Sequence, residues 1–292
     1  MAKSILLTGA TGFLGSHLLE ALLGNGYDVV ILKRSSSDTW RIQHLLERVK
    51  SYDVDKVPIE KAFEDQRIDA VIHTACHYGR NNDPISKVVE SNLMFGLRLL
   101  EVATFFNTDT FFNTDTLLHK HLNIYTLSKK QFVEWLRQQS DKIQVVNLKL
   151  EHMYGPMDDE TKFVQWIAGQ LEQQVDEIKL TKGEQLRDFI YIDDVVSAYL
   201  TALANTSQLD SFSEFDVGTG TLTSVRTFVE SLRFTYEKQY GMCKTQLNFG
   251  ALPYRNGEMM SVEVDNSGMM QLGWSPQTLI ADGIMQIIGG IQ

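Results

Sequence analysis

The chain has 292 residues, of which 43% are hydrophobic and 22% charged, and its formal net charge is −10. This composition is that of a globular protein large enough to bury a core, which excludes a wholly disordered chain. The excess of acidic residues excludes a nucleic-acid-binding protein, because contacts to phosphates need clustered lysine and arginine, and the longest basic run is Lys129-Lys130.

The cysteine content is low, with only Cys76 and Cys243 present. Two cysteines cannot form a disulfide framework or a four-cysteine zinc site, and no metal site is predicted. The N-terminal residues enter an apolar strand pattern at once, and no segment approaches the roughly 18 apolar residues that span a membrane. We therefore expect a cytoplasmic protein without a secretion signal or a membrane contact.

Strand and helix patterns alternate through the first half of the chain. The expected strands are 4–8, 28–33, 69–76, 111–116 and 143–150, and the expected helices are 13–23, 84–103 and 123–139. Apolar strands that alternate with helices predict a parallel sheet covered on both faces. The fold class is therefore α/β, with a Rossmann-type doubly wound parallel sheet. After Gly155-Pro156 the pattern is less regular, with helices expected at 193–204 and 224–239.

A hexapeptide, Phe-Phe-Asn-Thr-Asp-Thr, occurs twice in tandem at 105–110 and 111–116. A helix that ends near residue 103 needs a connection before the next strand begins. This spacing favours the second copy as the strand.

A glycine-rich loop follows the first expected strand and opens the first expected helix. Glycines in this context let the backbone turn tightly and approach a pyrophosphate at the helix N-terminus. The glycines are spaced Gly-x-x-Gly-x-x-Gly, and the loop predicts a dinucleotide site. The residues expected to bind the cofactor here are Gly9, Thr11, Gly12, Phe13, Leu14 and Gly15.

The end of the second expected strand indicates which cofactor is bound. A carboxylate there would suit the ribose of NAD, whereas a basic residue suits the 2′-phosphate of NADP. The chain has Lys33, Arg34 and Ser35 at this place, and no acid before Asp38. The sequence therefore favours NADP(H) over NAD, although a solvated Lys-Arg pair would give the same pattern.

The candidate catalytic residues are Tyr125 and Lys129, which lie four apart and so on one face of the expected helix. A lysine ammonium near a phenol lowers the pKa of the phenol from about 10, so the tyrosine can exchange a proton with a substrate oxygen. A hydroxyl at the end of the preceding strand would complete the set. Thr116 fits best, and Thr114 and Thr110 remain alternatives.

Together these motifs resemble the extended branch of the short-chain dehydrogenases/reductases, the NAD-dependent epimerase/dehydratase family. The segments 154–156, 187–195, 253–255 and 272–276 also match its pattern, so the resemblance covers essentially the whole chain. It implies cofactor contacts from His73, Thr74, Ala75 and Asn92 as well as from Tyr125 and Lys129. It also implies a homodimer formed through the helices that carry Asn92 and Tyr125.

Within that branch, the segments 75–84 and 148–152 look like the CDP-paratose and CDP-abequose synthases. Those enzymes reduce C4 of a CDP-4-keto-3,6-dideoxyhexose with NADPH for bacterial O-antigen (lipopolysaccharide) synthesis. The substrate contacts that the resemblance implies are Tyr78, Arg80, Asn81, Glu151, Arg187 and Arg255. For Arg187 a structural salt bridge fits equally well, and Asp193 and Asp194 suit the start of a helix.

The resemblance also implies a division into an NADP-binding Rossmann domain, residues 1–153 and 187–219, and a smaller α/β nucleotide-sugar-binding domain, residues 154–186 and 220–292. The related 4,6-dehydratases carry two acids after the catalytic threonine, whereas here Asp115 precedes Thr116 and two leucines follow it. This departure favours a nucleotide-sugar 4-ketoreductase. The alternatives are an NAD-dependent 4-epimerase and an inactive NADP sensor, and the latter would lack Tyr125 or Lys129. The base, the sugar and the C4 configuration stay open.

Overall fold

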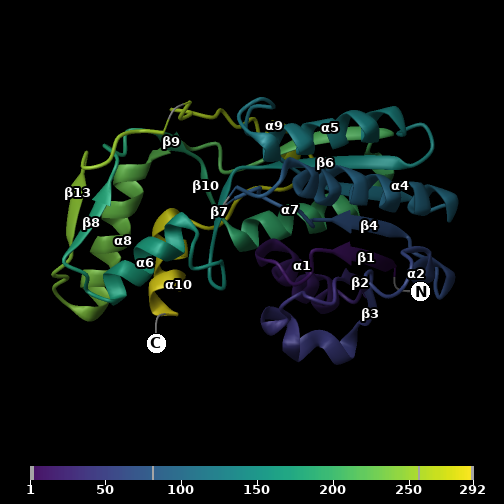
Figure 1. Cartoon of the computed structure of the whole chain (residues 1–292), viewed down its shortest axis with the longest axis horizontal. Helices are drawn as coiled ribbons and strands as arrows, with labels where there is room; N and C mark the ends of the chain where they lie inside the picture. Colours follow the sequence, from purple (N-terminus) through teal and green to yellow (C-terminus); the bar gives the residue numbers. More distant parts are fainter. Residues whose placement is uncertain (1–2, 81, 256, 291–292) are drawn as a thin grey trace. The chain divides into compact units, whose positions relative to one another are not determined.

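A computed structural model describes residues 3–80, 82–255 and 257–290 of the chain (Figure 1). The chain splits into two compact units. Unit 1 consists of Met1–Leu150, Val196–Asp216 and Gly268–Trp274, and unit 2 of Glu151–Val195, Val217–Ser267 and Ser275–Gln292. These limits differ from the expected ones in that residues 151–153, 187–195 and 217–219 lie in unit 2 and residues 268–274 in unit 1. One reason is that strands within 186–191 pair with other strands of unit 2.

Unit 1 contains a seven-stranded sheet. Its strands are β1 (Ser4–Thr8), β2 (Asp28–Lys33), β3 (Lys50–Asp53), β4 (Ala70–His73), β5 (Thr110–Thr116), β6 (Gln144–Leu150) and β11 (Phe212–Val217). Their order across the sheet is β11-β6-β5-β4-β1-β2-β3, and the pairings from β3 to β6 are parallel. This arrangement confirms the predicted Rossmann-type fold.

The helices of unit 1 cover both faces of the sheet. They are α1 (Phe13–Gly24), η1 (Trp40–Arg48), α2 (Glu60–Glu64), α3 (Ile85–Val89), η2 (Glu90–Met94), α4 (Phe95–Phe105), α5 (Ile124–Gln138), η3 (Thr206–Gln208), α9 (Ser267–Gln271) and the greater part of α7 (Ile192–Ala204). Figure 1 shows α4 and α5 on one face and α1 and α7 on the other. The central strand β1 is consequently buried on both sides, and Ile5, Leu6 and Leu7 have no exposed surface.

The repeated hexapeptide adopts two different structures. Its first copy contains the end of α4 at Phe105 and a turn through Asn107, whose φ is +55°. The second copy forms β5, which confirms the prediction that the strand lies in 111–116. Thr110, the last residue of the first copy, is the first residue of β5, and its hydroxyl donates a hydrogen bond to the Gln144 side chain at 2.9 Å.

Some elements differ from the expected pattern. The expected helix 84–103 is a continuous helical stretch, α3–η2–α4, in which η2 has π-helical hydrogen bonding. The expected strand 69–76 is only four residues long, because the chain leaves the sheet after His73. The sheet also includes β3 and β11, which the sequence patterns do not indicate.

Unit 2 contains three small two-stranded sheets and three long helices. The strand pairs are β7 (His152–Tyr154) with β10 (Phe189–Tyr191), β9 (Leu186–Arg187) with β12 (Thr223–Ser224), and β8 (Glu177–Leu180) with β13 (Gln246–Phe249). The helices are α6 (Phe163–Glu172), α8 (Val225–Tyr240) and α10 (Ile280–Gly289). Phe189 stacks on Phe228 with ring centroids 3.8 Å apart, and Tyr154 packs edge-on against both rings.

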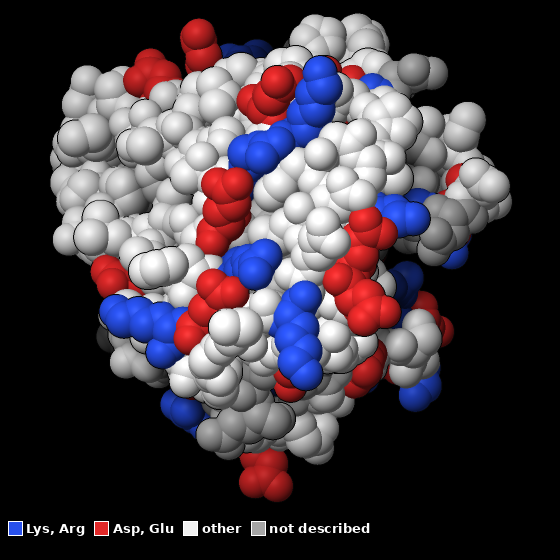
Figure 2. Space-filling view, turned by 90° about the vertical axis from the view of Figure 1, so that its left-hand side faces the viewer, with Lys and Arg blue, Asp and Glu red and all other residues white. Residues whose placement is uncertain are grey.

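The charges on the face drawn in Figure 2 are mixed: basic and acidic side chains alternate there and form no basic patch. Within the described residues, no helix combines the length and apolar character that a membrane crossing requires.

Candidate active site

The glycine-rich loop lies where β1 ends and α1 begins, packed tightly against the segment that follows β4. Gly9 has a φ of +71°, and a Cβ there would lie 2.6 Å from the Thr74 hydroxyl oxygen and 2.7 Å from the Ala75 nitrogen. A Cβ on Gly15 would lie only 2.0 Å from the Gly9 carbonyl oxygen. Glycine is therefore required at both positions for this close approach.

The start of α1 suits the phosphates of a dinucleotide. Gly12 is the N-cap residue and has no side chain to cap the helix, and the first turn contains no acid. The peptide N–H groups of this turn and the positive end of the helix dipole are thus available to an anion. The glycines and the uncapped helix end together fit a pyrophosphate.

Hydrogen bonds tie the ends of β1 and β4 together. The Thr74 hydroxyl donates to the Thr8 carbonyl at 2.7 Å, and the Ala75 amide donates to the Thr8 hydroxyl at 3.3 Å. The same hydroxyl lies 2.8 Å from Nδ1 of His73, which is fully buried. Burial lowers the pKa of His73 to about 3, so its ring is neutral. These contacts give His73 a structural role beside the loop.

Helix α5 brings Tyr125 and Lys129 to this edge of the sheet. Asn123 caps the helix, accepting a hydrogen bond from the Thr126 amide at 2.9 Å. The ring of Tyr78, which follows β4, lies 5.0 Å from the ring of Tyr125. Lys129 is 1% exposed. The cofactor loop, the segment after β4 and the Tyr-Lys helix thus belong to one unit.

Burial controls the proton affinity of both catalytic candidates. It raises the pKa of Tyr125 well above the usual value, and Cys76, Tyr78, Asp115 and Tyr199 add to this increase. It lowers the pKa of Lys129. The pKa of Tyr125 is therefore raised and not lowered as the Tyr-Lys spacing predicted, because the loss of solvation dominates. At neutral pH Tyr125 is protonated and can donate a proton.

Asn92 is fully buried in the π-helical turn η2. Its side-chain amide donates to the His77 carbonyl and to the Ser128 hydroxyl, both at 2.9 Å, and its oxygen accepts from the His77 amide at 2.6 Å. Both N–H groups are therefore used by the protein. Asn92 ties the segment after β4 to α5, and a direct contact with the cofactor stays a prediction.

The three candidate threonines lie at different places along β5. The Thr116 hydroxyl accepts from the Leu118 amide at 3.2 Å at the carboxyl end of the strand. The Thr114 hydroxyl shares a 2.6 Å hydrogen bond with Tyr199. Thr110 is six residues from Thr116, about 20 Å along an extended strand. Thr110 is therefore remote from the edge that holds Tyr125.

We expect Thr116→Val to lower turnover, because the hydroxyl would no longer bond the substrate oxygen, and we expect Thr110→Val to leave turnover near normal. A lost hydrogen bond to a reacting oxygen costs about tenfold or more. Steady-state kinetics of the two isosteric variants measures the difference. A larger loss in Thr110→Val would contradict the assignment.

Two carboxylates from the neighbouring strand contact the segment that follows β2, which the sequence patterns did not predict. Asp53 and Asp55, at and after the end of β3, accept hydrogen bonds from the hydroxyl and the amide of Ser35 at 2.6 and 2.8 Å. The Arg34 amide donates to Ser37 at 3.1 Å. These acids were not expected because β3 itself was not identified. They bring negative charge to the place where a 2′-phosphate would lie.

Besides Lys33 and Arg34, a further basic residue, Arg41, lies near the cofactor loop. The guanidinium of Arg41, in η1, donates to the Thr11 carbonyl at 3.3 Å and lies over the ring of Trp40. No motif in the sequence singled out this residue. The remaining candidates around the loop, Lys33 and Leu14, are half-buried and buried.

Three of the candidate substrate contacts follow β4. Arg80 lies over the ring of Tyr78, with 5.2 Å between the guanidinium carbon and the ring centroid. Both side chains are exposed, and Tyr78 adjoins Tyr125. Asn81 lies outside the described residues.

The other substrate candidates belong to unit 2. Glu151 is buried, with its carboxylate 2.9 Å from His152 Nδ1. Arg187 is buried and pairs with Glu258 at 2.6 Å, so it forms the structural salt bridge that was its alternative interpretation. Arg255 is exposed. A role for these residues in substrate binding stays a prediction.

Two acids of the motif 187–195 have structural partners within unit 2. Asp188 is fully buried and accepts hydrogen bonds from the amides of Thr219 and Gly220 at 2.9 and 2.7 Å. Asp194, in the first turn of α7, accepts from the amides of Gln277 and Thr278 at 2.8 and 3.0 Å. Both carboxylates therefore hold backbone turns in place.

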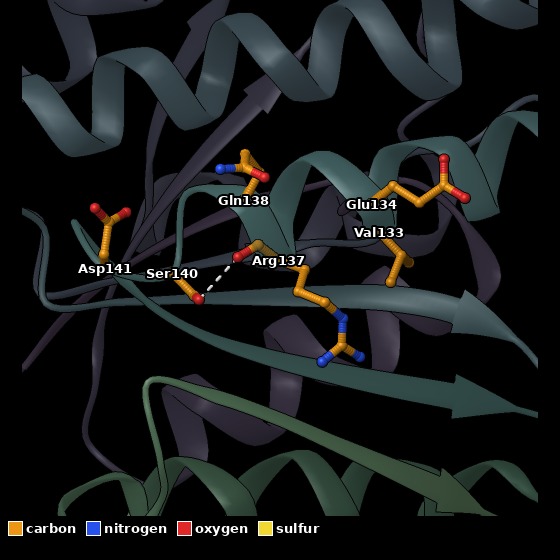
Figure 3. A pocket seen from close by; sticks show the side chains of 6 residues that line it. All are labelled: Val133, Glu134, Arg137, Gln138, Ser140 and Asp141. Carbon is orange, nitrogen blue, oxygen red and sulfur yellow. Dashed lines mark hydrogen bonds between the residues drawn. The ribbon is translucent and has the colours of Figure 1, made fainter.

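A pocket of about 400 Å³ lies at the far end of α5 (Figure 3). The residues that line it are Val133, Glu134, Arg137, Gln138, Ser140 and Asp141. Val133 is eight residues beyond Tyr125, about 12 Å along the helix, so the pocket is separate from the catalytic candidates.

No group of three or more potential metal ligands occurs among the residues that the structure describes.

The parallel sheet, the glycine loop and the Tyr-Lys helix define a short-chain dehydrogenase/reductase, a class of enzymes that use a nicotinamide dinucleotide. Residues 5–218 match the NAD-dependent epimerase/dehydratase family. The chain belongs to this family, which is the extended branch of the class.

Similar proteins cover nearly the whole chain. It is 33% identical to the CDP-abequose synthase of Salmonella typhimurium, over 99% of this chain and 98% of that protein, and 33% identical to the CDP-abequose synthase of Salmonella muenchen, over 98% and 97%. The UDP-glucuronic acid 4-epimerase of Bacillus cereus, in complex with UDP-glucuronic acid and NAD, has a TM-score of 0.83 and 25% identity, covering 99% and 98% of the two chains. The UDP-glucose 4-epimerase of Thermotoga maritima has the same fold, with a TM-score of 0.84, 22% identity and coverage of 98% and 97%.

Proposed function

We propose that the protein is an NADPH-dependent 4-ketoreductase of a nucleoside-diphosphate 4-keto-deoxyhexose, with CDP-4-keto-3,6-dideoxyglucose as the best candidate substrate and O-antigen synthesis as its role. The observation that carries this proposal is the half-buried Tyr125, whose pKa is raised by the loss of solvation, one helical turn from the buried Lys129. A reductase must give a proton to the new hydroxyl, and a tyrosine with a raised pKa arrives with that proton. The similarity to CDP-abequose synthases over the full chain favours the same substrate class.

In the proposed mechanism, a nicotinamide cofactor held by the glycine-rich loop and the start of α1 would supply the hydride for C4. Tyr125 donates its proton to the C4 oxygen, and the Thr116 hydroxyl orients that oxygen. The Lys129 ammonium stabilises the phenolate that remains, because the two residues are one helical turn apart. The N–H groups at the start of α1 would hold the pyrophosphate. Thr74 and Ala75, which pack against Gly9, would border the same place.

The second candidate is an NAD-dependent nucleotide-sugar 4-epimerase. The observation that favours it is the pair Asp53 and Asp55, which hold Ser35 and would repel a 2′-phosphate. The Bacillus cereus epimerase, similar in structure, was solved with NAD. Arg34 and Arg41 oppose this interpretation, since a guanidinium suits a phosphate.

The cofactor preference gives a direct prediction. Arg34→Asp should weaken NADPH binding by about 10- to 100-fold and NADH binding much less, because a charged hydrogen bond to the 2′-phosphate would be lost. Titration of both cofactors by fluorescence measures this preference. Arg48→Asp, an equal charge change at an exposed position of η1, is the control and should leave the preference unchanged. Equal losses for NADPH and NADH in Arg34→Asp would exclude Arg34 as the residue that reads the phosphate.

Reaction stoichiometry tests the proposed activity itself. A reductase consumes one NADPH for each product molecule, whereas an epimerase returns the hydride and has no net consumption. Purified protein is incubated with CDP-, dTDP-, UDP- and GDP-linked 4-keto sugars, and NADPH absorbance is followed while product is counted by chromatography. No loss of NADPH with any 4-keto sugar, together with conversion of a 4-hydroxy nucleotide sugar into its C4 epimer, would promote the epimerase, because a ketone cannot become an alcohol without a reductant.

The proposal includes a homodimer formed through α4 and α5. Large apolar side chains are exposed on this region, namely Met94 (40%), Phe105 (78%) and Trp135 (50%). Analytical ultracentrifugation over a range of concentrations measures the oligomeric state. Trp135→Glu should shift the equilibrium toward the monomer. A monomer at every concentration would contradict the proposal.

A further inference from the structure

We propose that the ion pair between Asp115 and Lys130 is a positioning pair that joins the catalytic strand to the catalytic helix beside Thr116 and Lys129. The inference rests on the proposed function, in which Tyr125 is the proton donor. It concerns two residues that none of the sequence motifs assigned to the site.

The pair links the immediate neighbours of two candidate catalytic residues. Lys130 Nζ lies 2.7 Å from the carboxylate of Asp115, whose side chain has no exposed surface, and it also donates to the Thr116 carbonyl. Asp115 precedes Thr116 in β5, and Lys130 follows Lys129 in α5. One ammonium group thus fixes the end of β5 against the first turns of α5. A shift of either element would change the distance between Thr116 and Tyr125.

A polar cluster continues from this pair across the sheet. Asn113 donates to Asn147 at 2.7 Å, and Asn147 donates to Glu214 at 2.8 Å and to Asp115 at 3.4 Å. Lys149 pairs with Glu214 and Asp216 at 3.3 and 2.6 Å. The cluster consists of Asn113, Asp115, Lys130, Asn147, Lys149, Glu214 and Asp216. It joins α5 and the ends of β5, β6 and β11, where a Rossmann sheet is ordinarily apolar.

Stability alone does not account for this cluster. Burying an ion pair costs about as much solvation as the attraction returns, and a well-packed apolar pair is often more stable. Oδ1 of Asp115 has no hydrogen-bond partner among the described residues, so its burial is incompletely compensated. A cost of this kind next to catalytic residues indicates a functional role.

The charges of the pair act on the catalytic residues with opposite signs. The loss of solvation is the main cause of both pKa shifts, which raises the pKa of Tyr125 and lowers that of Lys129. In addition, the Asp115 carboxylate acts to raise both pKa values, and the Lys130 ammonium acts to lower that of Lys129. The other groups that face Tyr125 are Cys76, Tyr78 and Tyr199, with Lys129 on its own helix. Asp115 is the carboxylate among the groups whose charge acts on Tyr125. Its counter-ion, Lys130, lies 2.7 Å from this carboxylate and offsets its charge.

The test measures the pKa of Tyr125 directly, without substrate. The full chain is labelled with ¹³C-tyrosine, the Tyr125 resonance is assigned with Tyr125→Phe, and its titration is followed by NMR. Asp115→Asn removes the carboxylate and should lower the pKa of Tyr125 by about one unit, whereas Lys130→Met leaves that carboxylate unpaired and should raise it by a similar amount. The double variant removes both charges and should titrate close to the original protein.

Glu134→Gln is the matched control. Glu134 is a carboxylate on the next turn of α5, and its side chain is 64% exposed. Figure 3 shows this side chain directed away from the strands. Solvent screens this charge, so the Tyr125 titration should not move. If Lys130→Met does not fold, the inference is still tested by comparing the Tyr125 pKa of Asp115→Asn with that of the double variant. The first should be lowered, and the second should be close to that of the original protein.

Two results would overturn the inference: shifts of the same sign in both single variants, which would indicate mere loosening of the fold, or no shift in Asp115→Asn. Because the titration needs no substrate, it stands even if no 4-keto sugar is turned over, which would be a failure of the proposed function alone. Where turnover is found, the alkaline limb of the pH profile should move with the NMR titration in each variant.

Discussion

Replacing Tyr125 by phenylalanine should reduce turnover by about 10²- to 10⁴-fold, the usual contribution of a positioned proton donor. The reason is that Tyr125→Phe keeps the ring, and with it the packing against Tyr78, but removes the hydroxyl that gives its proton to the C4 oxygen. Cofactor affinity should change little, because the glycine loop and the start of α1 hold the phosphates. Steady-state kinetics and a separate NADPH titration of the same preparation measure the two effects.

Tyr240→Phe is the control for this experiment. Tyr240 also loses a hydroxyl that bonds the protein, donating to the Ile288 carbonyl at 3.0 Å, but it belongs to unit 2 and to the end of α8. The turnover of Tyr240→Phe should therefore stay near normal. Near-normal turnover in Tyr125→Phe would instead remove Tyr125 from the mechanism, and a parallel loss of NADPH binding would assign it to cofactor binding.

Local sequence patterns predicted the elements whose signals lie within one segment. The apolar run 4–8, the helix from residue 13 and the strand 28–33 have the expected bounds within one residue. Strand β3, with sequence Lys-Ser-Tyr-Asp, has no apolar alternation and forms because β2 offers it a parallel partner. Strand β11 is likewise rich in polar residues, and its acids are matched by Lys149 on β6. Partners distant in sequence determine both strands.

In the candidate site, too, local features were predicted and contacts between distant segments were not. The Tyr125–Lys129 spacing and the glycine loop are local, and the sequence predicted both. The direction of the Tyr125 pKa depends on burial by other elements, which no spacing contains, and the prediction for it was wrong. Contacts between strands, such as Asp53 with Ser35 and Asp115 with Lys130, are equally invisible to motifs.

The second large effect is expected from one methyl group in the cofactor loop. A Cβ on Gly15 would lie 2.0 Å from the Gly9 carbonyl oxygen and 2.6 Å from its carbon, so Gly15→Ala must displace the backbone of the loop. Overpacking of this kind costs about 1–3 kcal/mol. If the loop moves to relieve it, the amide groups no longer meet the pyrophosphate, and NADPH affinity should fall by about 10- to 100-fold. Calorimetric titration measures the loss.

Gly24→Ala provides the matched control, because it is the same substitution in the same helix, with nothing within 4 Å of the new Cβ. Alanine is the better helix former by about 0.5–1 kcal/mol, so this variant should unfold at a slightly higher temperature and bind NADPH normally. The two variants should therefore move the unfolding temperature in opposite directions. Normal NADPH binding by a folded Gly15→Ala would mean that the loop tolerates the displacement and that the phosphates are held elsewhere.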